Sequence, residues 1–213
     1  MASDRDELER TIRQHCDRGE LQLGAAAAIR GYGPEVFGFL VAFHRGEEEA
    51  AEVFSEFTER LWRGLPGFAW ECSFRTWAYA IARNASLSYR RDRRRRAALH
   101  VPLPDGSDLS ALGQKVRSET VSYLRTQRKT RVAALRDALP AEDQALLVLR
   151  VDKQLPWNDL VRVMHPEDGP PLTDEIIARE GARLRKRFQL IKEKLYELGR
   201  REGLVGAPKD DRE

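Results

Sequence analysis

The sequence contains few of the residues from which disulfide frameworks and metal sites are built. Only 2 cysteines and 4 histidines occur among its 213 residues. Cys16 and Cys72 are too few for a disulfide scaffold, and they lack the paired spacing of zinc ligands. His15 stands beside Cys16 without a second pair of ligands, so we predict neither a metal site nor a bound cofactor.

Long hydrophobic runs are also missing from the sequence. No apolar stretch approaches the ~20 residues that a transmembrane helix needs. The N-terminal segment, MASDRDELERTIRQHCDRGE, is charged throughout, which excludes a secretory signal. We therefore expect a cytoplasmic protein.

The sequence lacks a recognisable catalytic constellation. It has no glycine-rich phosphate loop, no metal-ligand spacing, and no Ser/His/Asp or Cys/His arrangement. Glu47, Glu48 and Glu49 are adjacent on one predicted helix, so their side chains diverge and do not form a metal cluster. We predict no catalytic residues, which disfavours an enzyme that acts on nucleic acid.

Charge of one sign is absent from one segment of the chain and nearly absent from another. The net charge is only +3 at pH 7, but residues 47–59 hold six glutamates and no basic residue. Residues 83–96 hold seven arginines and a single aspartate. This segregation predicts an acidic face for one partner and a basic face for another.

Apolar residues recur at steps of three and four along most of the chain, which predicts an all-α protein. The GYGP sequence at 31–34 predicts a break between two helices. Residues 47–62 form an amphipathic helix with glutamates opposite its apolar face. Ser73 and Thr173 are expected to cap the helices that follow them.

Proline and glycine divide the chain into two helical blocks. The sequence VPLPDGSDLSALGQKVR at 101–117 is typical of a linker. We predict two small helical domains joined by a flexible linker, with a helix-turn-helix in the C-terminal domain. The predicted parts are an N-terminal extension (1–24), the first domain (25–98), the linker (99–118), the second domain (119–204) and a tail (205–213).

The segment SFRTWAYAIARNASLSYRRDRRRR at 73–96 combines an aromatic first half with an arginine-rich second half. Arginines are not buried unpaired, so they are expected to face solvent or a polyanion. A solubilising helix end is the alternative. Aromatic side chains beside a basic strip suit single-stranded bases. Trp70, in the preceding loop, is a better candidate for a base contact than Phe74 or Trp77, which fit a core.

The last predicted helix carries a second basic motif, RLRKRF at 183–188. Leu184 and Phe188 fall on its apolar seam. The basic side chains of the motif point away from that seam: Arg183, Arg185, Lys186 and Arg187. A recognition helix presents donors to guanine edges and phosphates in this way. A charged surface helix would have the same pattern, so both interpretations remain open.

Two motifs resemble a known family. ERLWRGLPGF followed by SFRTWAYAIARNASLSYRRDRRRR is similar to the second conserved domain of bacterial sigma factors of the extracytoplasmic-function type. LRDALPAEDQALLVLRVDKQLPWNDL resembles the start of their fourth conserved domain. The motifs stand in the family's order and cover roughly 25–98 and 128–200.

The resemblance implies a protein that binds core RNA polymerase, through the β′ clamp helices and the β subunit, and promoter DNA. The polymerase-binding residues it implies are Glu49, Glu52, Glu56, Arg60 and Trp62. Those implied for the −10 element, where the loop would hold a flipped base, are Trp70, Glu71, Ser73, Arg83, Asn84, Ser88, Arg91 and Arg94. Those implied for the −35 element are Arg179, Arg183, Arg185, Lys186 and Arg187.

A stand-alone helix-turn-helix regulator is the alternative function. It would explain the basic last helix, but not the acidic helix or the aromatic and arginine-rich segment. Only a sigma factor requires core polymerase to direct transcription. Whether an anti-sigma factor also binds stays open, because that partner is another chain.

Overall fold

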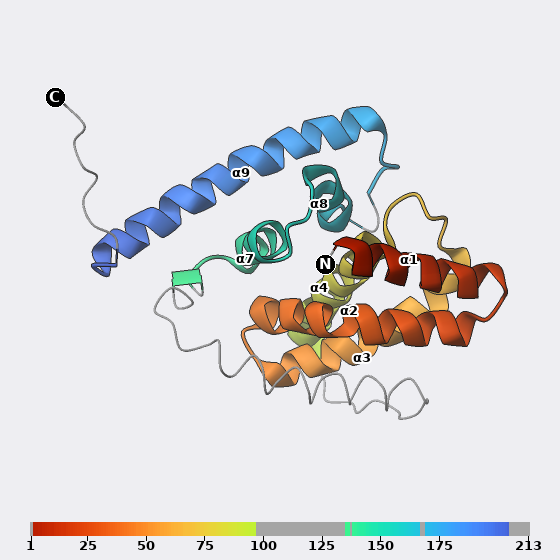
Figure 1. Ribbon diagram of the computed structural model, residues 1–213. Helices are drawn as coiled ribbons and strands as arrows, with labels where there is room; N and C mark the ends of the chain where they lie inside the picture. The colour runs from red at the N-terminus through yellow and green to blue at the C-terminus, as the bar shows by residue number, and fades with distance from the viewer. Residues whose placement is uncertain (1, 97–134, 137, 167–168, 205–213) are drawn as a thin grey trace.

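The computed structural model describes residues 2–96, 135–136, 138–166 and 169–204, and this part of the chain is helical without strands (Figure 1). The predicted linker, the start of the predicted second domain and the tail lie outside the described residues. The main helices are α1 (Ala2–Asp17), α2 (Leu21–His44), α3 (Glu47–Gly64), α4 (Phe74–Arg96), α7 (Ala141–Leu147), α8 (Trp157–Met164) and α9 (Asp174–Arg201). The all-α prediction is confirmed.

Two short turns of other helix types complete the described elements. A 3-10 turn, η1 (Leu65–Gly67), follows α3, and a π-helical turn, η2 (Val148–Asp152), follows α7. None of the described helices is long and apolar enough to span a membrane.

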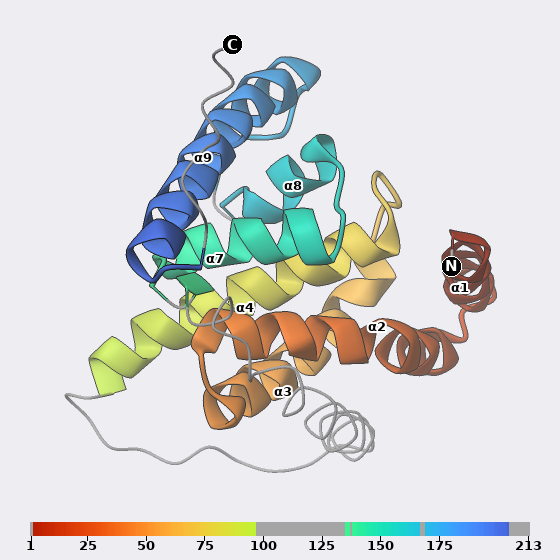
Figure 2. The same cartoon turned by 60° about the vertical axis from the view of Figure 1, so that its left-hand side comes forward.

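The N-terminal helix α1 packs along α2 (Figure 1), and α2 packs against α3 and α4 (Figure 2). The predicted break at 31–34 is wrong, because α2 runs continuously through Pro34. Gly31 serves close packing instead of a turn: a Cβ atom there would lie 2.2 Å from Leu8 Cδ2 of α1. Buried side chains on both sides of the proline, including Ile29 before it and Val36 after it, keep this helix in contact with its neighbours.

Several local signals fixed helix ends as predicted. The α3 helix ends at Gly64, in the glycine- and proline-containing segment. Ser73 precedes α4, and its Oγ accepts a hydrogen bond from Thr76 N at 3.1 Å. Thr173 precedes α9, and its Oγ1 accepts one from Ile176 N at 3.3 Å. These are N-cap bonds, which satisfy helix N–H groups that have no partner within the helix.

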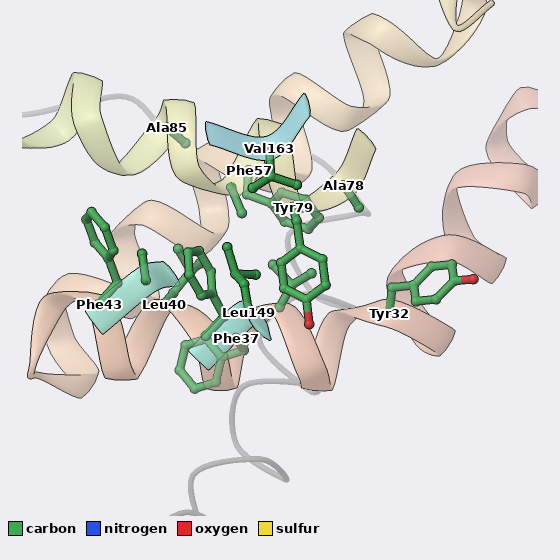
Figure 3. Close-up of a cluster of buried hydrophobic side chains, with 14 of the residues drawn as sticks. Tyr32, Phe37, Leu40, Phe43, Phe57, Ala78, Tyr79, Ala85, Leu149 and Val163 are labelled. Carbon is green, nitrogen blue, oxygen red and sulfur yellow. The ribbon is translucent and has the colours of Figure 1, made fainter. Parts of the chain in front are cut away.

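The buried side chains form one core that reaches from α1 to α9. Figure 3 shows Phe37 and Leu40 of α2, Tyr79 of α4 and Leu149 of η2 in one cluster. The α8 helix lies between α4 and α9, and α7 contacts α2. The C-terminal helices therefore pack directly on the helices of the N-terminal block.

Candidate nucleic-acid interface

The loop before α4 brings four aromatic rings together. Phe68 stacks on Trp77 with 4.5 Å between ring centroids, and the Trp70 centroid lies 4.8 Å from that of Phe68. Phe74, which is fully buried, meets the rings of Phe68, Trp70 and Trp77. Trp70 itself is half-buried at the edge of this cluster, whereas Glu71 and Ser73 are exposed. The arrangement places one indole where a base could stack on the remaining surface of the cluster.

The first turn of α4 is held by a residue that the sequence did not single out. Glu9 of α1 accepts hydrogen bonds from Phe74 N at 2.8 Å and from Arg75 N at 3.0 Å. Tyr32 Oη donates to the same carboxylate at 2.7 Å. Burial, together with this bond and the Glu9 charge, raises the pKa of Tyr32 far above its usual value. No local pattern marks Glu9, because its partners lie 23 to 66 residues away.

One face of α4 is covered by the C-terminal helices. Arg83 was predicted to contact the −10 element from the surface, but it is only 7% exposed. Its Nη2 donates to Glu142 of α7 at 3.3 Å. The prediction that Arg83 faces solvent is therefore wrong in this arrangement, because a glutamate from a distant helix supplies the partner that burial requires.

Arg75 and Thr76 lie on the covered part of α4 as well. Arg75 pairs with Glu35 of α2, and its Nη2 donates to the backbone oxygen of Lys153 at 2.8 Å. Burial alone would lower the pKa of Arg75, but the hydrogen bond and charge of Glu35 raise it. Burial raises the pKa of Asp159 in α8, and a hydrogen bond from Thr76 partly offsets that rise. This face of α4 is thus joined to both blocks by polar contacts.

The exposed part of α4 carries the other candidates for DNA contact. Asn84 and Ser88 are half-buried and Arg91 is exposed, with Arg91 Nη2 donating to Ser88 Oγ at 3.3 Å. A hollow of about 310 Å³ lies beside them and is lined by Arg60, Ser88, Arg91 and Asp92. Arg60, expected at the polymerase contact, therefore lies beside residues expected to bind DNA.

The arginine run divides between packing and exposure. Arg90 lies over the Phe43 ring at 4.3 Å from its centroid, and its Nη2 donates to the Phe43 backbone oxygen at 3.0 Å. It therefore packs α4 on the end of α2. Arg94 is in α4, but its side chain lies outside the described residues.

The acidic helix α3 presents its glutamates opposite its buried residues, as its period predicts. Glu52 is exposed, and Glu49 and Glu56 are half-buried. Glu56 accepts a hydrogen bond from Arg60 at 2.6 Å. Trp62 is 37% exposed near the end of the same helix. Four acidic or aromatic candidates for polymerase contact thus remain accessible on one helix.

The basic side chains at 179–186 of α9 differ in their surroundings. Arg179 and Arg183 are exposed, and both pair with Glu180. The hydrogen bond from Arg183 is the main cause that lowers the pKa of the Glu180 carboxyl. Lys186 is exposed, and the exposed Arg185 lies 5.6 Å from the Trp157 ring centroid of α8.

Arg187 differs from the other basic residues of α9. It was predicted to point away from the apolar seam, but its Nε donates to Asp143 of α7 at 2.7 Å. That prediction is wrong, because Arg187 is next to the seam residue Phe188 and its long side chain reaches α7. The helix-turn-helix itself stays a prediction.

Part of the chain resembles known proteins. Residues 28–96, which run from α2 to the end of α4, match the family described as Sigma-70 region 2. The chain is also 24% identical over 184 residues to the RNA polymerase sigma-H factor of Pseudomonas aeruginosa, across 82% of this chain and 91% of that protein. These two matches support a sigma factor that acts in transcription initiation. The matched region of this chain contains the aromatic loop, the acidic helix and all of α4, whereas α1 lies outside it.

Proposed function

We propose that this chain is a sigma factor of the extracytoplasmic-function type and that three of its surfaces act in transcription initiation. The acidic surface of α3 binds the β′ clamp helices of core RNA polymerase. The loop at 68–73 and the exposed part of α4 engage the −10 element. The basic residues of α9 engage the −35 element.

The observation that carries this proposal is the aromatic loop joined directly to the basic helix within the matched region. Trp70 offers a half-buried ring for a flipped base, while Ser88 and Arg91 offer donors farther along α4. Because arginine binds phosphate oxygens through a planar fork of donors, Arg91 suits the strand backbone.

The covered face of α4 limits which residues can take part. Arg75 and Arg83 are engaged by Glu35 and Glu142, so neither is offered to DNA in this arrangement. The −10 contacts that we propose are those on the open side: Trp70, Glu71, Ser73, Asn84, Ser88 and Arg91. Arg187 likewise leaves the proposed −35 set, because it is paired with Asp143.

Run-off transcription with core RNA polymerase on the promoter upstream of the protein's own gene tests the proposed function. A transcript is expected only when both core enzyme and this protein are present. Changing Glu52→Lys and Glu56→Lys together should lower affinity for core polymerase about tenfold, because a complementary charged rim would become repulsive. Affinity is measured in a pull-down without DNA.

The matched control for this charge reversal lies on α9. Glu193→Lys and Glu197→Lys have the same spacing and are also exposed, so core affinity should not change. Equal affinity of the wild type and the α3 variant would remove α3 from the polymerase contact. A shift of operator DNA by the protein alone, with no transcript from the complete mixture, would favour the stand-alone regulator.

The proposed −35 contacts predict a change in salt dependence. Replacing Arg183, Arg185 and Lys186 with alanine should weaken binding of the holoenzyme to promoter DNA and reduce the slope of log K against log salt. Each lost phosphate contact removes about 0.9 from that slope on duplex DNA. Core binding should remain, because these side chains are exposed on α9 and do not lie on α3.

A second triple variant keeps the lost charge constant. Lys194, Arg200 and Arg201 are exposed farther along the same helix, and replacing them with alanine removes the same number of positive charges. The slope should change less in this control. Identical slopes in both triple variants would mean that general charge, and not the 183–186 segment, attracts DNA.

A further inference from the structure

The N-terminal helix α1 contacts the proposed −10 loop although it lies outside the matched region. Its Glu9 carboxylate uses one oxygen for Phe74 N, at 2.8 Å, and the other for Arg75 N, at 3.0 Å. These N–H groups belong to the first turn of α4 and have no partner within the helix. A negative charge at this end also interacts favourably with the helix dipole.

The loop does not supply an equivalent cap by itself. Ser73 Oγ accepts a hydrogen bond from Thr76 N, which leaves the two preceding N–H groups to Glu9. Tyr32 of α2 donates to the same carboxylate and thereby fixes its orientation. The start of α4, and with it the end of the loop, is therefore located by α1 and α2 together.

A second contact joins α1 to the middle of the loop. Arg13 stands four residues after Glu9, on the same side of α1. Its guanidinium carbon lies 5.3 Å from the Trp70 ring centroid, in cation–π geometry. Trp70 has a φ of +59°, a left-handed conformation that large side chains rarely adopt. A residue in such a conformation needs surrounding contacts to keep it there.

We propose that α1 is a working part of the −10 site, in which Glu9 and Arg13 are positioning residues for base capture by the loop at 68–73. Glu9 fixes the α4 end of the loop, and Arg13 holds the Trp70 ring in place for a base to stack. Neither residue reads the base. The inference rests on the proposed function of the loop.

The decisive measurement is the ratio of two affinities. Holoenzyme is titrated with the non-template −10 strand of the promoter used for run-off transcription, and with the same strand carrying an abasic site. To choose the abasic position, the abasic site is first placed at each nucleotide of the −10 strand in turn. The position used is the one at which the wild type loses most affinity. Glu9→Gln should lower the preference for the intact strand about tenfold, because one charged hydrogen bond to the α4 start is lost and the other weakened.

The control is Glu7→Gln, which makes the same chemical change at an exposed position of α1 and should leave the ratio unchanged. A purely structural role of Glu9 would lower both affinities together and keep their ratio constant. Arg13→Ala supplies a second variant that leaves the core intact, since Arg13 is exposed, and should lower the ratio about threefold. Arg10→Ala, also exposed on α1, is its control.

The outcomes separate the inference from the function on which it rests. A wild-type preference for the intact strand that persists in both Glu9→Gln and Arg13→Ala overturns the role of α1 alone. A ratio that falls as much in the Glu7 and Arg10 controls also overturns it. A wild type that binds both strands equally at every abasic position overturns base capture by the loop as well.

Discussion

Replacing Glu35 with alanine is expected to lower the free energy of unfolding by about 3 kcal/mol. Glu35 accepts two hydrogen bonds from Arg75, from Nε at 2.7 Å and from Nη2 at 3.2 Å. Arg75 is buried beneath the C-terminal block, where its Nη2 also donates a hydrogen bond to the Lys153 backbone oxygen. Removing the carboxylate would leave a buried charge without its counter-ion, which is the costly way to break such a pair. Urea denaturation followed by circular dichroism measures the loss.

Two further variants test whether the unpaired charge is the cause. Glu59 forms an exposed ion pair with Arg63 four residues away, so Glu59→Ala should cost less than about 0.5 kcal/mol. Adding Arg75→Met to Glu35→Ala should recover part of the lost stability, because the double variant buries no charge. If Glu35→Ala costs no more than Glu59→Ala, water reaches Arg75 and the pair does not contribute to the junction.

Features coded by neighbouring residues were predicted well from the sequence. The caps at Ser73 and Thr173 and the end of α3 depend on side chains within one helical turn. The predicted helix break at 31–34 was wrong for a physical reason. Gly31 allows close contact with Leu8 of α1, a residue more than twenty positions away. A glycine that permits close helix contact has the same sequence signature as one that permits a turn.

In the candidate site, too, properties set by local sequence were predicted and contacts with distant residues were missed. The exposures of Glu52 and Arg91 follow from helical periodicity and agree with the sequence, whereas Trp62, which the period groups with the apolar residues, is 37% exposed. Arg83 could not be placed from the sequence, because its partner Glu142 stands 59 residues away. Glu9 was missed since capping by a separate helix leaves no local pattern.

The division of the chain into two domains remains a prediction, and the shared core gives it a physical test. Side chains from α7, η2 and α8 are buried in the same cluster as those of α2 and α4. Independent domains joined only by a linker would each keep a separate core and would unfold separately. A single core instead predicts that damage in one block destabilises the other.

Leu149→Ala provides this damage and is expected to cost about 3 kcal/mol. Leu149 is 0% exposed in η2 and lies among Phe37 and Leu40 of α2 (Figure 3). Single-tryptophan versions retaining Trp157 or Trp77 report on the two blocks during urea unfolding. Both midpoints should fall together, whereas Val151→Ala, at a position 45% exposed in the same turn, should move neither. If only the Trp157 transition moved, the contact between the blocks would add no stability, and the two domains predicted from the sequence would unfold independently.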